Sequence, residues 1–142
     1  IMIRYKLYQN KIEGSTAYNL WYARAVCDET YDTEALAKHM SSHNTPYSAG
    51  VIHGVLKDMI ACIKELLLDG KNVKLDDLAI FSVGIKSKGA TAVADFNVAE
   101  NVTGLKLRAR ATGSLSTSTL RQDAVIKQLT KYSVSEGETV QE

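Results

Sequence analysis

Three cationic side chains near the C-terminal end of the chain alternate with apolar ones. Lys106, Arg108 and Arg110 are separated by Leu and Ala residues, which is the two-residue period of a β-strand. On such a strand the three cations share one face and stand about 7 Å apart, because each residue advances the chain by about 3.3–3.4 Å. Phosphates along one strand of a nucleic-acid duplex recur on the same length scale. The pattern indicates either a phosphate-binding face or an ordinary solvated face of an antiparallel sheet.

The charges of the 142 residues are unevenly distributed. The formal net charge is only +1, with 17 Lys+Arg and 16 Asp+Glu, which excludes a chain that is basic throughout but not one with a basic face. Residues 71–111 hold 7 Lys+Arg against 4 Asp+Glu, whereas the segments before and after them are slightly acidic. The basic segment contains two further lysines that we expect on the same sheet face: Lys86 and Lys88.

Periodicity and capping residues predict the elements of the first half of the chain. Apolar and basic residues alternate in 3–8, and a segment rich in Tyr, Trp and Ala follows at 18–26, which together predict an N-terminal β-hairpin. Asp32 is suited to cap a short helix. Ser48 is suited to cap a longer helix, which we expect to end before Gly70 at a left-handed C-cap.

The second half of the chain changes to the period of a strand. Residues 73–75, 81–85 and 105–111 predict three strands. Between the last two, residues 87–103 are small and weakly polar, which predicts a loop or a protruding ribbon. Apolar residues return at helical spacing in 120–132, so we expect a C-terminal helix there.

The long predicted helix carries more apolar surface than one neighbouring element needs. Its apolar positions form a double row: Val51, Ile52, Val55, Leu56, Met59, Ile60, Ile63, Leu66 and Leu67. Such a helix either lies centrally in the core or is covered from a second side by another subunit. The pattern alone leaves both arrangements open.

The sequence contains no convincing catalytic or metal-binding motif. His39 and His43 stand four residues apart, which suits a divalent metal only if a third ligand joins them, and no glutamate between them completes a His-Glu-x-x-His motif. Cys27 and Cys62 lack C-x-x-C spacing, so we expect separate buried thiols in a reducing cytoplasm, with a disulfide as the alternative. We predict a protein that is not an enzyme and has no cofactor, no metal, no small-molecule substrate and no membrane-spanning segment.

The order of these elements, together with particular residues, resembles the bacterial HU and integration-host-factor family of histone-like DNA-binding proteins. The similarity covers roughly residues 33–132 and is strongest in 66–75 and 78–83. There a glycine closes the second helix, a Val-x-Leu strand follows, and Phe81 stands at the end of a turn where the family has Gly-Thr-Phe. The residues that lead from Tyr22 into the first helix resemble divergent HU-like proteins of Bacteroides and relatives.

The resemblance implies an α+β fold with a helical pair, a three-stranded antiparallel sheet with a protruding β-arm and a C-terminal helix, assembled as an intertwined homodimer. In the family, the arms enter the DNA minor groove and a proline near each tip kinks the duplex. By position the arm is residues 86–106, which contain no proline; Val93, Phe96 and Val98 are either an apolar wedge or ordinary hairpin side chains. The cations implied to bind DNA are Lys74, Lys86, Lys88, Lys106, Arg108, Arg110, Arg121 and Lys127.

The sequence therefore predicts three parts: an N-terminal β-hairpin extension (1–31), an HU-like DNA-binding domain (32–132) and a flexible acidic tail (133–142). We expect non-specific or weakly specific binding of double-stranded DNA by a homodimer in the bacterial cytoplasm, with a nucleoid-associated, DNA-condensing role. The alternative is an HU-like protein–protein assembly module that has lost DNA binding. Near-zero net charge, the proline-free arm and the aromatic residues of the hairpin favour that alternative.

Overall fold

The computed structural model describes residues 1–129 and divides the chain into two compact units. One unit is Tyr31–Leu120, and the other combines Ile1–Thr30 with the described residues 121–129. Residues 121–129, which belong to the HU-like domain in the sequence prediction, therefore group with the N-terminal hairpin. The predicted tail and residues 130–132 lie outside the described residues. Among the described residues, no helix is long and apolar enough to cross a membrane.

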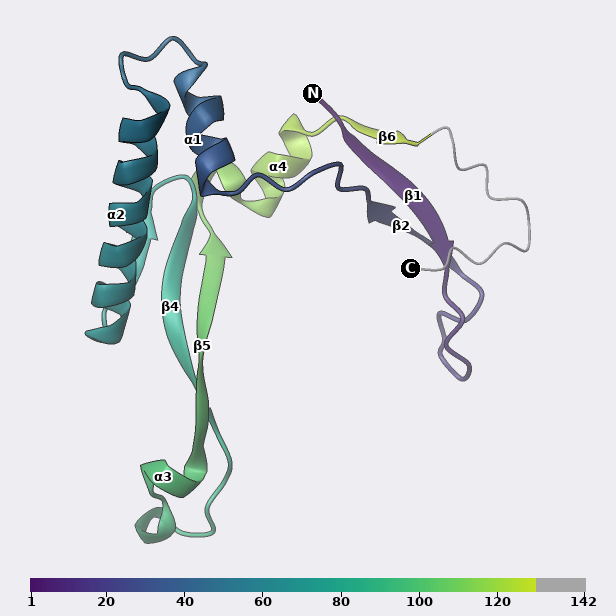
Figure 1. Cartoon of the computed structure of the whole chain (residues 1–142). Helices are drawn as coiled ribbons and strands as arrows, with labels where there is room; N and C mark the ends of the chain where they lie inside the picture. The colour runs from purple at the N-terminus through teal and green to yellow at the C-terminus, as the bar shows by residue number, and fades with distance from the viewer. Residues whose placement is uncertain (130–142) are drawn as a thin grey trace. The chain divides into compact units, whose positions relative to one another are not determined.

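Two helices form one side of the larger unit. α1 (Thr33–Ser41) begins after Asp32, whose carboxylate accepts a hydrogen bond from Ala35 N at 2.8 Å. α2 (Ala49–Leu68) begins after Ser48, whose hydroxyl accepts from Val51 N at 3.2 Å. Both N-caps are confirmed, and Gly70 adopts the left-handed φ of 74° expected of a residue that ends a helix. The helices lie side by side in Figure 1, with Ala37 and Ile52 buried.

The sheet of this unit has the strand order β3–β4–β5, with β3 at Val73–Leu75, β4 at Ala79–Ser87 and β5 at Val102–Ala111. All pairings are antiparallel, and Phe81 lies between Val73 and Ala109. α2 packs against β3 and β4. The apolar members of the strand alternation therefore face the helix, and the polar members face away from it.

The turn between β3 and β4 is tied to the end of β5. Asp77 occupies the left-handed region at φ 61°, and its carboxylate accepts a hydrogen bond from Ser114 N at 3.2 Å. The Ser114 hydroxyl donates to Asp77 O at 3.2 Å, and Thr112 N donates to Leu78 O at 3.1 Å. Gly113 (φ 56°), the first residue of η2 (Gly113–Leu115), lies against Asp77. These contacts fix the turn before β4 against the segment that follows β5, at one end of the sheet.

Beyond the helices, β4 and β5 continue together as a two-stranded arm (Figure 1). Its tip contains two short helices, η1 (Val93–Asp95) and α3 (Val98–Asn101), where the sequence predicted a loop or a ribbon. Asn101 is only 6% exposed. Its side-chain nitrogen donates to Lys88 O (3.1 Å) and Gly89 O (3.4 Å), and its side-chain oxygen accepts from Asn97 N at 3.0 Å. One buried amide therefore links both sides of the tip.

The smaller unit is a three-stranded sheet in the order β2–β1–β6. β1 (Ile3–Gln9) pairs antiparallel with β2 (Trp21–Ala25), and β6 (Ile126–Gln128) adds to the other edge of β1 in parallel. The returning strand thus begins at Trp21 rather than at residue 18. Arg4 forms an ion pair with Asp28, and the hydrogen bond that Arg4 donates lowers the pKa of the Asp28 carboxyl.

The helix predicted over 120–132 is wrong at 126–128, where the chain forms a strand, and residues 130–132 lie outside the described part. The structure has a short helix, α4 (Thr117–Asp123), followed by β6. Val125 and Ile126 are β-branched and favour a strand. The open edge of β1 supplies the partner, since Ile3 N donates to Val125 O at 2.8 Å and Leu129 N donates to Tyr5 O at 3.0 Å.

Replacing Gly113 by Ala should destabilise the larger unit. A Cβ at this position would lie 2.1 Å from the Asp77 carboxylate and 2.9 Å from its Cα, in a backbone conformation that L-residues rarely adopt. We expect a loss of about 1–3 kcal/mol in the free energy of unfolding, measured by chemical denaturation. Gly89→Ala is the matched control, because nothing lies within 4 Å of its Cβ. Equal stability of the two variants would contradict the proposed role of this turn.

Candidate nucleic-acid interface

The register of the larger sheet places five cations on a single face. Directly opposed residues of an antiparallel pair project from the same face. Lys106 lies opposite Gly84, Arg108 opposite Ser82, and Arg110 opposite Ile80. Ile80 is also the partner of Lys74, and Lys86 is the partner of Gly104. We call the resulting surface the basic face; its cations are Lys74, Lys86, Lys106, Arg108 and Arg110.

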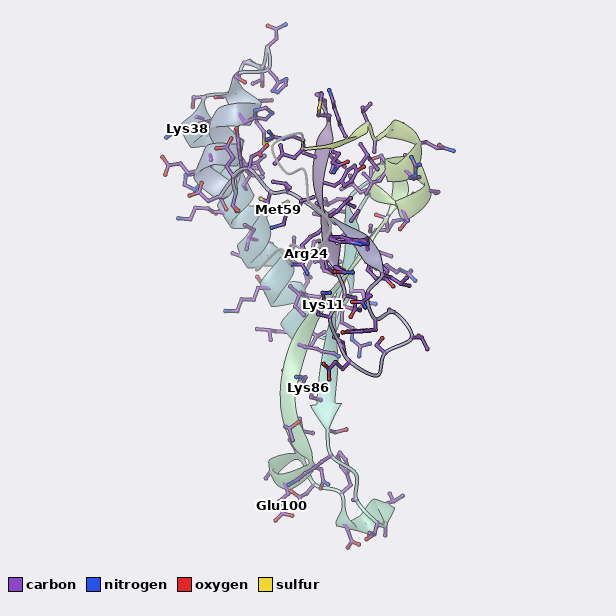
Figure 2. The ribbon with its side chains drawn as sticks, turned by 90° about the vertical axis from the view of Figure 1, so that its right-hand side faces the viewer. Lys11, Arg24, Lys38, Met59, Lys86 and Glu100 are labelled. Carbon is purple, nitrogen blue, oxygen red and sulfur yellow. The ribbon has the colours of Figure 1, made fainter. Side chains whose placement is uncertain are left out.

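All five side chains of the basic face are exposed. Lys74 lies 3.8 Å from the Asp76 carboxylate, measured from Nζ to Oδ1, in a loose and solvated ion pair. The other four form no ion pair with any described residue. Lys86 is labelled on the arm in Figure 2. A row of cations, four of which have no acidic partner among residues 1–129, is suited to binding an external polyanion.

Arg108 lies across a glycine of the neighbouring strand. A Cβ built on Gly84 would be 2.6 Å from Arg108 Nε and 3.0 Å from its Cζ, and Gly84 is buried although it lies on this face. The missing side chain allows the guanidinium to approach the backbone of β4. Sequence reasoning missed this role, although a glycine inside a strand commonly marks a close approach.

Three of the sequence-predicted cations are not placed on the basic face by the register. Lys88 follows the register shift at Lys86–Ser87 and belongs to the tip, where its N–H donates to Asn101 O at 2.8 Å. Arg121 is in the last turn of α4, and Lys127 is in β6 of the smaller unit, opposite Arg4. Their participation in a common site remains a prediction.

The opposite side of the same sheet is apolar and partly uncovered. A hollow of about 430 Å³ lies between α2 and the sheet, bounded by Ile60, Leu67, Phe81 and Leu107 among others. Ile60 is 52% exposed and Leu107 is 64% exposed. Among the described residues, no large side chain is fully buried. This side therefore has the character of a core that a single chain leaves incomplete.

The histidine pair and the cysteines carry no recognisable reactive site. The Nε2 atoms of His39 and His43 lie 3.1 Å apart, and Tyr31 meets the His39 ring edge to face. Within residues 1–129, no three His, Cys, Asp or Glu side chains converge as metal ligands. Cys27 and Cys62 are free thiols, and both are exposed, so the expected burial is wrong.

Comparison with known proteins shows the family to which the chain belongs. Residues 1–125 match the HU-HIG family, in which an HU domain is fused to wHTH, Ig, or a glycine-rich motif. The chain belongs to this family. The HU resemblance recognised in the sequence is confirmed, and the HU-HIG match includes the N-terminal hairpin as well as the sheet, the helices and the arm.

A crystal structure of a candidate bacterial DNA-binding protein from Bacteroides vulgatus has the same fold, with a TM-score of 0.66 at 12% sequence identity. The similarity covers 90% of this chain and 48% of the other, so the chain spans about half the length of that structure. The sequence matches no curated protein.

Replacing Gly84 by Ala should displace the Arg108 guanidinium while leaving the fold intact, because the obstructing atoms belong to the end of a flexible side chain. We expect the Arg108 Nε–Hε resonance to shift in a ¹H–¹⁵N spectrum. Gly104→Ala is the matched control on the same face, since nothing lies within 4 Å of its Cβ. An unchanged Arg108 resonance in Gly84→Ala would contradict this contact.

Proposed function

We propose that this protein binds double-stranded DNA as a homodimer, with little or no sequence specificity, and acts as a nucleoid-associated architectural protein. The observation that carries the proposal is the placement of five cations on the basic face. Membership of an HU-containing family and the fold shared with a candidate DNA-binding protein support it. The protein would then act in the bacterial cytoplasm without a cofactor or a catalytic step.

The chemistry of the basic face favours contacts to phosphates over readout of bases. Lysine and arginine on adjacent strands bind phosphate oxygens by charge-assisted hydrogen bonds and release condensed counterions from the duplex. Such contacts fix the position of a protein on DNA but carry no sequence information. Any preference would arise from the shape and deformability of the duplex. Binding would therefore tolerate many sequences and weaken steeply with salt.

The uncovered apolar side of the sheet provides the reason for a homodimer. α2 keeps apolar residues exposed: Val55 is 63% exposed, and Ile60, at the hollow beside the sheet, is 52% exposed. On the arm, Ile85 and Leu105 lie opposite each other and are 65% and 61% exposed. A second copy would cover this surface and join the two sheets, which would bring two basic faces into one DNA-binding surface.

The arm would grip DNA without the wedge that a proline provides. The chain has a single proline, Pro46, which lies outside the arm. At the tip, Val93 is 95% exposed and Phe96 is 45% exposed. We propose that the arms track the groove through their cations. Strong intercalative kinking is not part of this proposal.

An assembly module that keeps the HU fold but binds protein instead of DNA is the second candidate. The large exposed apolar surface is the observation that favours it. The salt dependence of the binding affinity distinguishes the two functions. DNA affinity falls by orders of magnitude between about 50 and 200 mM salt, whereas the affinity of apolar association does not.

Removing the three cations of β5 should abolish most of the DNA binding. We expect Lys106→Gln/Arg108→Gln/Arg110→Gln to lower the slope of log affinity against log salt by about 2.7 for each protomer, at about 0.9 per phosphate contact, and so by about 5.4 for a dimer that binds through both basic faces. The measurement is a fluorescence-anisotropy titration of a short duplex. Lys38→Gln/Lys57→Gln/Lys71→Gln removes the same charge from exposed positions elsewhere and is the control. Identical slopes for the two triple variants would refute the proposal.

Placing a charge on the uncovered part of α2 should prevent dimer formation. In Ile60→Glu a carboxylate would enter the apolar surface that we assign to the interface, at a cost of several kcal/mol. Sedimentation equilibrium should report a dimer for the unmodified chain and a monomer for Ile60→Glu. Ala61→Glu adds the same charge at the next, exposed position of the helix and should remain a dimer. A monomeric unmodified chain would overturn this part of the proposal.

A further inference from the structure

The smaller unit carries a cationic and aromatic face of its own. In its sheet, Lys6 lies opposite Arg24 and Tyr8 lies opposite Tyr22. Arg4, two residues before Lys6, lies opposite Lys127 of β6. Because paired residues and alternate residues of a strand share a face, these six side chains project from one side of the sheet. We call this side the hairpin face; its members are Arg4, Lys6, Tyr8, Tyr22, Arg24 and Lys127.

A hollow at one end of the hairpin face brings three cations together. It measures about 370 Å³ and is lined by Lys6, Lys11 and Arg24, with Tyr8 and polar groups of the loop. None of the described residues that line it is acidic. Lys11 and Arg24 are labelled in Figure 2, and both belong to the hairpin. The arrangement offers a concentrated positive charge to an anion.

Contacts within the hairpin hold these cations in place. Lys11 Nζ donates to Asn19 Oδ1 at 3.0 Å. The Arg24 guanidinium lies over the Tyr8 ring, 4.6 Å from its centroid, and the Tyr8 ring lies 5.9 Å from that of Tyr22. A guanidinium stacked on an aromatic ring keeps its orientation, so Arg24 forms a fixed wall of the hollow beside the lysines. Arg4 is paired with Asp28 and Arg24 has a further interaction of its own, so we count only Lys6 and Lys11 as binding groups.

We propose that the hairpin face is a second surface for the phosphate backbone of duplex DNA, separate from the basic face. Ammonium donors around a hollow suit phosphate oxygens, and the phenol of Tyr22, which is 37% exposed, adds a further donor. The choice of DNA over other polyanions rests on the function proposed above. The cationic hollow itself is independent of the basic face, because it consists entirely of residues from the smaller unit.

Neutralising two lysines tests this surface while leaving the Arg24–Tyr8 contact intact. We expect Lys6→Gln/Lys11→Gln to lower the salt slope for a short duplex by about 1.8 for each hairpin face in contact, and to lower the affinity by more than about tenfold at about 100 mM salt. Lys38→Gln/Lys57→Gln removes the same charge from exposed helix positions and should leave both unchanged. Circular dichroism of all variants verifies that the fold is retained. Equal salt slopes and equal affinities for Lys6→Gln/Lys11→Gln and for the control variant would overturn the proposal.

Lysine acetylation of the unmodified protein provides a readout that needs no variant. In the presence of the duplex, mass spectrometry should find Lys6 and Lys11 protected, with Lys57 as the unprotected internal reference. Acetylation of Lys6 and Lys11 at an unchanged rate would overturn the proposal. Binding of a single-stranded RNA that depends on these two lysines, with duplex binding unaffected, would also overturn it.

The two surfaces fail in distinguishable ways. Loss of duplex binding on neutralising β5 but not the hairpin would leave the proposed function standing and remove this inference. Loss of duplex binding on neutralising the hairpin lysines but not the β5 cations would support this inference and contradict the role proposed for the basic face. Losses with both sets of variants would establish that the chain contacts DNA through two surfaces.

Discussion

The antiparallel register of β3, β4 and β5 is the constraint on which the rest of the larger unit depends. It gathers Lys74, Arg108 and Arg110 on one side and Val73, Phe81 and Leu107 on the other. A slip of one residue in any strand would exchange the two sides, because successive side chains point in opposite directions. The polar contacts between Asp77 and Ser114 join the turn after β3 to the end of β5 and oppose such a slip.

Much of this arrangement could be predicted from local sequence, because its causes are local. Alternation around Arg108 predicted a strand with cations on one face, and the capping residues Asp32 and Ser48 marked where the helices begin. Only the resemblance to HU proteins suggested how these elements combine. The N-caps Asp32 and Ser48 could be predicted without knowledge of the fold, since each side chain binds a backbone N–H within three residues.

The failures of sequence reasoning share a physical origin in contacts between distant segments. Ile126 lies in a strand because β1 offers an unpaired edge more than a hundred residues earlier in the chain, and helical spacing cannot reveal that partner. The register shift at Lys86–Ser87 removes Lys88 from the strand alternation, and no residue type in this segment predicts the shift. The close approach of the Arg108 guanidinium to Gly84 is likewise a contact between two strands. Tyr8 and Tyr22 share a face, whereas Tyr5 and Trp21 lie on the other, so the aromatic residues of the hairpin divide between its two faces.

A preordered arm tip follows from the buried amide of Asn101. Its contacts with Lys88, Gly89 and Asn97 close the tip in the isolated chain. A segment that is already closed has few alternative conformations left to lose when it meets a partner, so less of the gross interaction energy is spent on ordering it. The arm can therefore bind its partner with its tip already folded, and the association rate is limited by diffusion and orientation and not by a slow folding step.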